Sequence, residues 1–230
     1  MQNNESFRHE LKYPIHYADY LGIRQRLRPV MRPDEYTAED GRYLVRSVYF
    51  DNLKDDALRE KMNGIAKREK FRLRYYNDDF SFIALEKKIK INSLCRKLDA
   101  KLTVQEYKAL LQGDVSWMMG HSSELVKEFY CKLKGRQLRP RVLVSYLREP
   151  YVYAAGNVRV TFDSHIRSSL FHQCFLEKSA PDIGVAEAPG DMIMEVKFDA
   201  FLPEVIQTLL QTAGIRQQAY SKYSACRRFG

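Results

Sequence analysis

Hydrophobic and polar residues alternate with a period of two in seven segments of the chain. Successive side chains of a β-strand point to opposite faces, so this alternation predicts strands that each have one buried face. The predicted strands are Phe7–Tyr13, Tyr43–Asp51, Glu69–Tyr76, Phe80–Ile89, Arg141–Tyr153, Val158–Phe162 and Met192–Phe198. Turn-forming residues at 77–79 and 155–157 predict hairpins between neighbouring strands.

Four further segments have the spacing of amphipathic helices. They run from His16 to about Arg28, from Thr103 to Gly113, from Ser123 to about Leu133 and from Pro203 to Thr212. Few neighbouring strands are joined by a helix, so the order favours an α+β fold with a mainly antiparallel sheet over a doubly wound parallel one. No linker, repeat or low-complexity tract interrupts the sequence, and a single domain over residues 1–230 is expected.

The polar faces of the predicted strands are rich in lysine and arginine. Lys70, Arg72 and Arg74, for example, share the face opposite a phenylalanine, a leucine and a tyrosine. Single glutamates, Glu10, Glu86 and Glu195, lie among the cations of three other strands. The cations counted at such positions and in the C-terminal segment are Arg8, Lys12, Arg72, Arg74, Lys88, Lys90, Arg148, Arg159, Lys197 and Lys222. The formal net charge of the chain is +9, and these positions supply most of it.

This concentration of charge indicates a polyanionic ligand. If the polar faces converge on a lumen, two like charges ~6 Å apart repel by roughly 3 kcal/mol at an effective dielectric constant of ~20. Phosphates would relieve this repulsion, since arginine suits bidentate contact with phosphate and lysine provides a point charge. The pattern leaves two alternatives open: a basic face exposed to solvent, and a nucleic-acid-binding surface. Against the second, the sequence has no helix-turn-helix, RNP or KH signature.

Composition excludes several other classes of protein. With 45% hydrophobic residues the chain is not globally disordered, and no apolar run approaches the ~18–20 residues of a membrane-spanning helix. The N-terminal residues lack the apolar core of a secretion signal, so a cytoplasmic location is expected. Four cysteines without a CxxC pair are expected to be reduced, and the histidine spacing gives no metal motif.

Eight short motifs follow one another in a characteristic order. They are Arg8-x-Glu10-x-Lys12-Tyr13, Arg46-Ser-Val-Tyr49-Phe50-Asp51, Lys70-x-Arg72-x-Arg74-x-Tyr76, Leu85-Glu86-x-Lys88, Tyr146-x-Arg148, Arg159-x-Thr161-Phe162-Asp163, Glu195-x-Lys197-Phe198 and Ser221-Lys222-Tyr223. In this order the sequence resembles the VTC (vacuolar transporter chaperone) polyphosphate polymerase domain. That domain belongs to the CYTH-like, or triphosphate tunnel metalloenzyme, superfamily. The resemblance spans nearly the whole chain, from about Phe7 to Phe229.

The resemblance implies a closed, tunnel-like barrel of about eight antiparallel strands with helices packed outside. Its lumen would bind ATP or another nucleoside triphosphate, polyphosphate or pyrophosphate, together with Mn²⁺ or Mg²⁺, and transfer the γ-phosphate to a polyphosphate chain. The positions that match phosphate-binding residues are Lys12, Arg72, Arg74, Lys88, Arg148, Arg159 and Lys222, and we add Lys197. Catalytic roles are expected for Lys222, Arg72 and Arg74. Metal binding is expected for Glu195, with Glu10 and Glu86 as further carboxylates.

One position departs from the pattern of the superfamily. Arg8 occupies the first glutamate position of the ExExK motif, which weakens metal binding by the first strand and moves the site toward phosphate binding. The same lumen would also suit a metal-dependent tripolyphosphatase or polyphosphatase, or a non-catalytic polyphosphate-binding module. Lys222 has an alternative interpretation as a surface residue of a final helix. Membrane association, if any, would require a separate partner protein.

Overall fold

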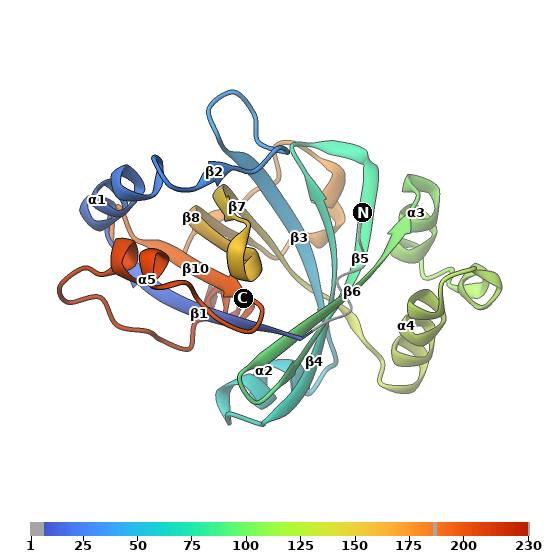
Figure 1. The fold of residues 1–230 in the computed structure, drawn as a ribbon. Helices are drawn as coiled ribbons and strands as arrows, with labels where there is room; N and C mark the ends of the chain where they lie inside the picture. Colours follow the sequence, from blue (N-terminus) through green and yellow to red (C-terminus); the bar gives the residue numbers. More distant parts are fainter. Residues whose placement is uncertain (1–6, 186–187, 230) are drawn as a thin grey trace.

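The computed structural model describes residues 7–185 and 188–229, and it contains a ten-stranded sheet (Figure 1). The strands are β1 (Arg8–Ile15), β2 (Arg32–Pro33), β3 (Tyr43–Asp51), β4 (Lys67–Tyr76), β5 (Asp79–Ile91), β6 (Leu94–Leu102), β7 (Arg139–Tyr153), β8 (Val158–Ser169), β9 (Ile183–Gly184) and β10 (Met192–Phe198). All seven strands predicted from alternation are present, with ends displaced by several residues in some cases.

Eight of these strands close into a ring in which every neighbouring pair is antiparallel. The hydrogen-bonded order is β7–β3–β4–β5–β6–β1–β10–β8, and β8 pairs again with β7. The contact between β1 and β6 is the shortest, with two residue pairs. The short strands β2 and β9 add to β7 and β8. The predicted fold class, a mainly antiparallel α+β protein with an eight-stranded closed arrangement, is therefore confirmed.

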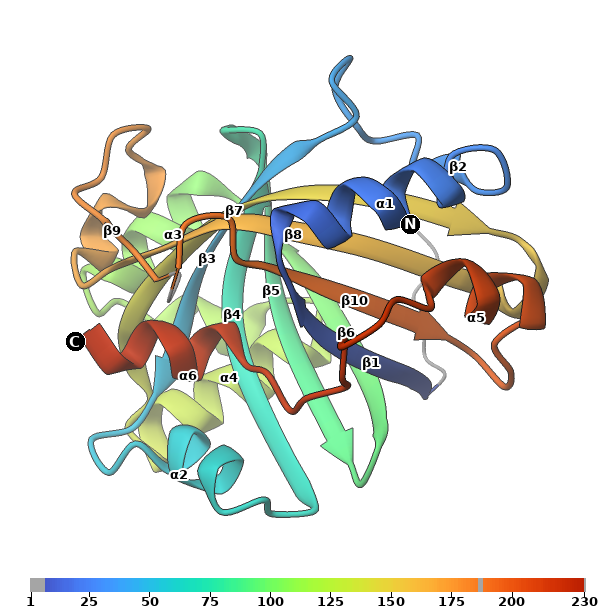
Figure 2. The same cartoon turned by 90° about the vertical axis from the view of Figure 1, so that its left-hand side faces the viewer.

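Four α-helices pack on the outside of the ring. They are α1 (Tyr17–Leu27) and α5 (Glu204–Leu210) on one flank, and α3 (Val104–Leu111) and α4 (Glu124–Gly135) on the other (Figure 1). Two short helices, α2 (Asp56–Met62) and α6 (Lys222–Cys226), lie near one end of β4 and across the ring, respectively (Figure 2). No helix in the described part of the chain is both long and apolar enough to span a membrane.

The apolar faces of the strands point outward, toward the helices. Phe71, Leu73 and Tyr75 of β4 belong to a core cluster that includes Phe129 of α4, whose ring stacks on Phe71 at 5.2 Å between centroids. A second cluster joins β8 and β10 to α1 and α5. Because side chains alternate along a strand, the lysines and arginines between these apolar residues face the inside of the ring. A third cluster, which includes Val45, Val144 and Tyr223, lies on the inward-facing side of β3 and β7, so the interior contains apolar side chains beside the charged ones.

Five strands and α-helices of the described residues were not predicted, each for a local reason, and two of them, β2 and β9, are only two residues long. In β6, Arg96 occupies a position on the otherwise apolar face and is followed directly by Lys97, so the alternation of apolar and polar residues is obscured. Helix α2 has no buried residue and therefore no apolar stripe. Helix α6 is only five residues long, which is too short to show helical periodicity.

Candidate functional site

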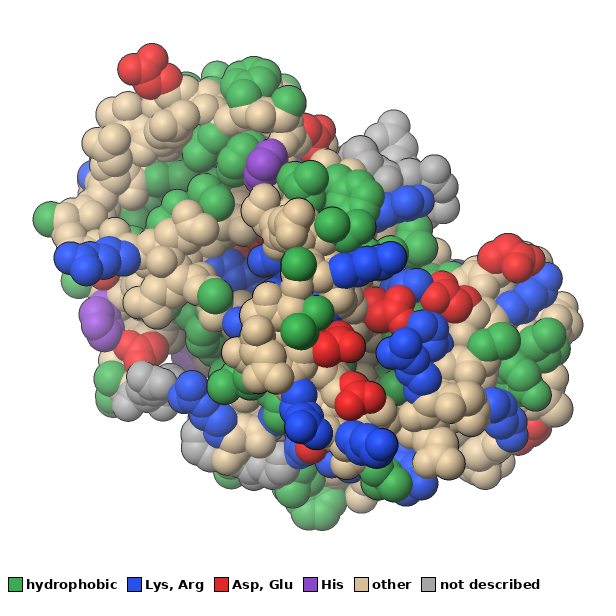
Figure 3. Space-filling view, turned by 90° about the horizontal axis from the view of Figure 1, so that it is seen from below, with side chains coloured by type: hydrophobic (Ala, Val, Ile, Leu, Met, Phe, Trp, Pro, Cys, Tyr) green, Lys and Arg blue, Asp and Glu red, His purple; other side chains and the backbone are tan. Residues whose placement is uncertain are grey.

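A cavity of about 260 Å³ lies inside the ring, and cationic side chains dominate its lining. Seven ring strands contribute to it, together with α2, α6 and the segment that precedes α6. Eleven lysines and arginines face two carboxylates there: Lys12, Lys61, Arg68, Lys70, Arg72, Arg74, Lys88, Lys90, Arg148, Lys197 and Lys222 against Glu10 and Glu195. Seen from below, the surface shows a hollow with lysine and arginine atoms inside it (Figure 3).

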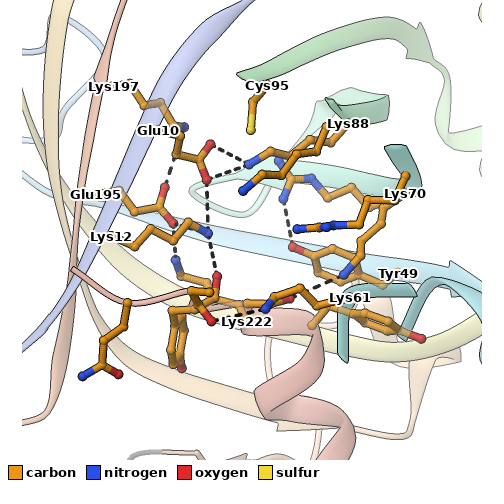
Figure 4. A pocket seen from close by; sticks show the side chains of 18 of the residues that line it. Glu10, Lys12, Tyr49, Lys61, Lys70, Lys88, Cys95, Glu195, Lys197 and Lys222 are labelled. Atoms are coloured by element: carbon orange, nitrogen blue, oxygen red, sulfur yellow. Dashed lines mark hydrogen bonds and ion pairs between the residues drawn. The ribbon is translucent and has the colours of Figure 1, made fainter. Parts of the chain in front are cut away.

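The carboxylates Glu10 of β1 and Glu195 of β10 lie on neighbouring strands, on either side of Lys12 (Figure 4). The Nζ of Lys12 is 3.1 Å from Glu10 Oε1 and 3.4 Å from Glu195 Oε1. Lys88 of β5 donates to both oxygens of Glu10, at 2.7 and 2.6 Å. These contacts join β5 to β1, the two strands that flank β6 in the ring.

Arg72 and Arg74 of β4 are held by groups on both neighbouring strands. Arg72 donates from Nε to Glu86 Oε2 of β5 at 2.6 Å and from Nη1 to the hydroxyl of Tyr49 of β3 at 2.8 Å. Arg74 donates to the hydroxyl of Tyr146 at 3.2 Å and lies 3.7 Å from the same Glu86 oxygen. Both guanidinium groups are therefore fixed before any ligand binds, which lowers the entropic cost of binding one.

Arg148 of β7 forms the most extensive buried ion pair of the site. Its Nε and Nη2 donate to the two oxygens of Asp163 at 2.6 and 2.7 Å, in the bidentate geometry typical of strong pairs. Lys222 at the start of α6 lies 2.5 Å from Asp163 and 2.9 Å from Glu195. Lys222 is 6% exposed, so its interpretation as a surface residue is wrong.

Residues 211–221, here called the strap, connect α5 to α6 and cross the opening of the ring (Figure 2). Lys12 donates from Nζ to the Tyr220 carbonyl at 3.0 Å, and the Gln218 amide donates to the Lys12 carbonyl at 2.9 Å. At its end, the Tyr223 hydroxyl donates to Asp51, which also accepts from backbone amides at the start of α2. These bonds explain how a short C-terminal segment places Lys222 inside the ring.

Burial and neighbouring charges shift several pKa values in the cavity. Burial opposes the ionised form of Glu10, but Lys88 and Lys12 outweigh it and hold the pKa of this carboxyl well below its usual range. Lys222 and Lys12 do the same for the pKa of Glu195. In contrast, burial lowers the pKa of Lys70 to about 7, and repulsion from Lys12 and Arg68 adds to the shift. Burial also lowers the pKa of Lys197 to about 7, although Glu10 opposes this.

Most of the predicted site residues meet in this cavity. Lys12, Arg72, Arg74, Lys88, Arg148, Lys197 and Lys222 line it, as do Glu10 and Glu195. Two predicted residues are not part of the lining. Arg159 instead pairs with Asp34 at 2.8 Å and donates to the Tyr43 hydroxyl at 3.0 Å. Glu86 is 1% exposed and forms an ion pair with Arg72, which does line the cavity.

Several important residues were not singled out from the sequence. The motifs give Asp163 no role, yet it contacts both Arg148 and Lys222. The available signal was that Asp163 shares one face of β8 with Thr161 and Arg159, which lie two and four residues before it. Lys61 comes from a helix without an apolar pattern, and Gln218 comes from the strap, which has no regular structure. Nothing in their local sequence indicates a place in the cavity.

Glu10 and Glu195 are the carboxylates that line the cavity, and both already contact lysines. Within residues 7–185 and 188–229, no group of three or more histidine, cysteine, aspartate or glutamate side chains is arranged to hold a metal. Mg²⁺ is commonly bound by one or two carboxylates plus substrate phosphates, and Glu195 and Glu10 provide such a pair. Arg8, at the position where the superfamily has another glutamate, pairs with Asp199 at 2.7 Å, and it is absent from the lining.

A closed antiparallel ring whose interior is lined by cations and two carboxylates is the architecture of a triphosphate tunnel protein. The sequence matches the VTC domain family over residues 7–229, and the chain belongs to that family. The resemblance inferred from the eight motifs is confirmed. No curated protein matches the sequence.

The solved structures that share the fold include two that each cover more than four fifths of this chain. One is a protein from Bacillus halodurans provisionally assigned as an adenylate cyclase, with 16% identity and a TM-score of 0.50, covering 84% of this chain and 80% of the other. The second is the PH1819 protein from Pyrococcus horikoshii, with 14% identity and a TM-score of 0.52. It covers 97% of this chain and 99% of the other. At these identities the similarity concerns the fold.

Proposed function

We propose that the protein is a polyphosphate polymerase, which transfers the γ-phosphate of ATP or another nucleoside triphosphate to a polyphosphate chain inside the cavity. The main support is the convergence of eleven cationic side chains on one enclosed space, in a chain of the VTC domain family. Phosphoryl transfer needs little covalent chemistry from the protein, so positioning and neutralisation of charge provide most of the catalysis.

In this proposal Arg72, Arg74 and Arg148 hold successive phosphates. Each has a guanidinium group already fixed by a carboxylate or hydroxyl, and each lines the cavity. Lys222 approaches from the strap side and neutralises the phosphate that enters or leaves. Glu195, with Glu10, would hold Mg²⁺ or Mn²⁺ jointly with phosphate oxygens, and the metal would add positive charge at the transferred group.

Synthesis of polyphosphate from ATP tests this proposal. Purified protein incubated with ATP and Mn²⁺ or Mg²⁺ should produce long phosphate chains that are visible on a gel. Lys222→Met should abolish the product, whereas Lys134→Gln, which removes an exposed lysine outside the cavity, should not. Release of phosphate from tripolyphosphate without any chain product would contradict polymerisation and favour a tripolyphosphatase. Binding of polyphosphate with neither activity would favour a binding module.

A further inference from the structure

The eleven cations of the cavity divide into two groups according to their ion pairs. Seven of them lie 2.5–3.7 Å from a carboxylate and are called the inner cluster: Lys12, Arg72, Arg74, Lys88, Arg148, Lys197 and Lys222. The other four, Lys61, Arg68, Lys70 and Lys90, are called the outer cluster. In the described part of the chain, none of these four forms an ion pair with a carboxylate.

The register of β4 and β5 explains this division. Arg72 lies opposite Glu86, so the cross-strand pair is compensated. The next two inward-facing pairs toward the start of β4 are Lys70 opposite Lys88 and Arg68 opposite Lys90. Like charges placed directly opposite one another destabilise a sheet, so this end of the hairpin carries a repulsion that the other end does not.

The partners of the outer cluster are neutral groups. Arg68 donates to the Ile65 carbonyl at 2.6 Å, and Lys61 donates to the Ala219 carbonyl of the strap at 3.3 Å. The amine of Lys70 lies 4.8 Å from the centre of the Tyr223 ring. Figure 4 shows Lys61 and Lys70 on the side of the cavity away from Glu195. All four side chains are half-buried, so water screens their repulsion incompletely.

The two clusters form one continuous row. Every second residue of β4, on its inner face, is a cation, from Arg68 through Lys70 and Arg72 to Arg74. The six residue steps from Arg68 to Arg74 span roughly 20 Å of extended strand. A triphosphate is much shorter than this row, so the inner cluster alone can accommodate it. The row continues to the end of the ring where α2 and the β5–β6 turn lie (Figure 2).

We propose that the outer cluster binds the part of a long polyphosphate chain that extends beyond the inner cluster, and that the chain therefore leaves the cavity at the α2 end. This inference rests on the proposed function, since it concerns the same ligand. A polyphosphate carries negative charge at regular intervals along its length, which matches a row of cations without local counter-charges. Burial and mutual repulsion lower the pKa values of Lys61, Lys70 and Lys90, in agreement with a segment that lacks anions of its own.

The test compares ligands of two lengths. Calorimetry would measure the affinity of tripolyphosphate and of long-chain polyphosphate for the wild-type protein and for the triple variant Lys61→Gln, Arg68→Gln, Lys90→Gln. The variant should lose about tenfold or more in affinity for the long chain, because it loses three partly buried phosphate contacts. Its affinity for tripolyphosphate should change less than about twofold. The matched control Arg28→Gln, Lys108→Gln, Lys134→Gln removes three exposed cations outside the cavity and should change neither affinity.

Other outcomes have distinct meanings. Equal losses for the two ligands, or no loss for either, would overturn the assignment of the outer cluster while leaving the proposed function intact. Wild-type protein that binds neither ligand would instead contradict the proposed function. A single-stranded oligonucleotide that binds as tightly as polyphosphate through the same three residues would assign the cluster to nucleic acid. If the triple variant does not fold, Lys61→Gln alone, in α2 outside the ring, must show the same length-dependent loss.

Discussion

The inner and outer clusters lie in one cavity and have the same sign of charge, but they differ in what surrounds each cation. Arg148 is held by a fully buried aspartate, and Arg72 by a glutamate that is 1% exposed. Lys70 has a tyrosine ring and a serine hydroxyl as neighbours instead. The comparison shows two ways to prepare a site for phosphate: carboxylates can fix the direction of a cation, or their absence can leave its charge uncompensated.

The difference has a consequence for stability. A buried ion pair contributes little net free energy, but the loss of one partner costs much because it leaves the other charge unpaired. Repulsion among the cations of the outer cluster destabilises the folded state. Removal of one of these charges should therefore not lower the free energy of unfolding and should tend to raise it. Substitutions in the two clusters should therefore change stability in opposite directions.

Asp163→Asn is expected to have the largest effect. It removes the counter-charge that Arg148 and Lys222 share, and the free energy of unfolding should fall by about 3–5 kcal/mol. Lys70→Met in the outer cluster should leave the protein at least as stable as the wild type. Urea denaturation of both variants measures the two values. Equal destabilisation by the two substitutions would show that the clusters do not differ in compensation.

Glu195→Gln tests the chemistry of the inner cluster. This substitution keeps the shape of the side chain but replaces the negatively charged carboxylate, the proposed metal ligand, with a neutral amide. Metal-dependent turnover should therefore fall by more than about a hundredfold. Tripolyphosphate binding without metal should persist, because the cations that contact it remain. Initial rates with ATP and Mn²⁺, together with calorimetry in a chelator, provide the measurements. Turnover close to that of the wild type would exclude Glu195 as the metal ligand.

A smaller effect is expected on the pH dependence of binding, to which Lys70 of the outer cluster and Lys197 of the inner cluster both contribute, since the pKa of each is about 7. The pKa of Lys70 is about 7, so its charge is present below pH 7 and is lost as the pH rises. Affinity for long-chain polyphosphate should therefore fall between pH 6 and pH 8.5, by about tenfold at most from one such group. The interior phosphates of a long chain remain ionised over this range, and Lys70→Met should flatten the profile. An unchanged slope in Lys70→Met would assign the pH dependence to other groups.

Linkage gives the opposite sign for the stability of the protein without a ligand. The pKa of Lys70 is about 7 in the folded protein and close to 10.4 in an unfolded chain. The unfolded state therefore binds more protons between these values, and the contribution of Lys70 to stability improves as the pH rises through this window. Stability and polyphosphate affinity should thus respond to pH in opposite directions at this residue.

Alternation along strands predicted the fold and much of the candidate site. Residues such as Arg72 and Lys88 lie on strands with one apolar face, so their direction follows from the direction of that face. Residues outside regular strands do not follow this alternation. Lys61 reaches the cavity from α2 and Gln218 from the strap, and their positions depend on tertiary contacts with Asp51 and Lys12.

The division into two clusters could not be predicted either, because it depends on register. The sequence places Glu86 and Lys88 on one face, but only the pairing of β4 with β5 decides which cation lies opposite the glutamate. Similarly, Asp163 gains its role because Arg148 lies opposite it on β7. Cross-strand partners distant in sequence are a property of the closed ring rather than of any single segment.

The central claim is that the inward-facing cations converge on one phosphate chain. Its most direct test is a crystal structure of the protein soaked with tripolyphosphate. We expect phosphate oxygens within ~3 Å of Arg72, Arg148 and Lys222 in the same molecule of ligand. Tripolyphosphate bound on the outer surface of the ring, with none between these three side chains, would contradict the claim.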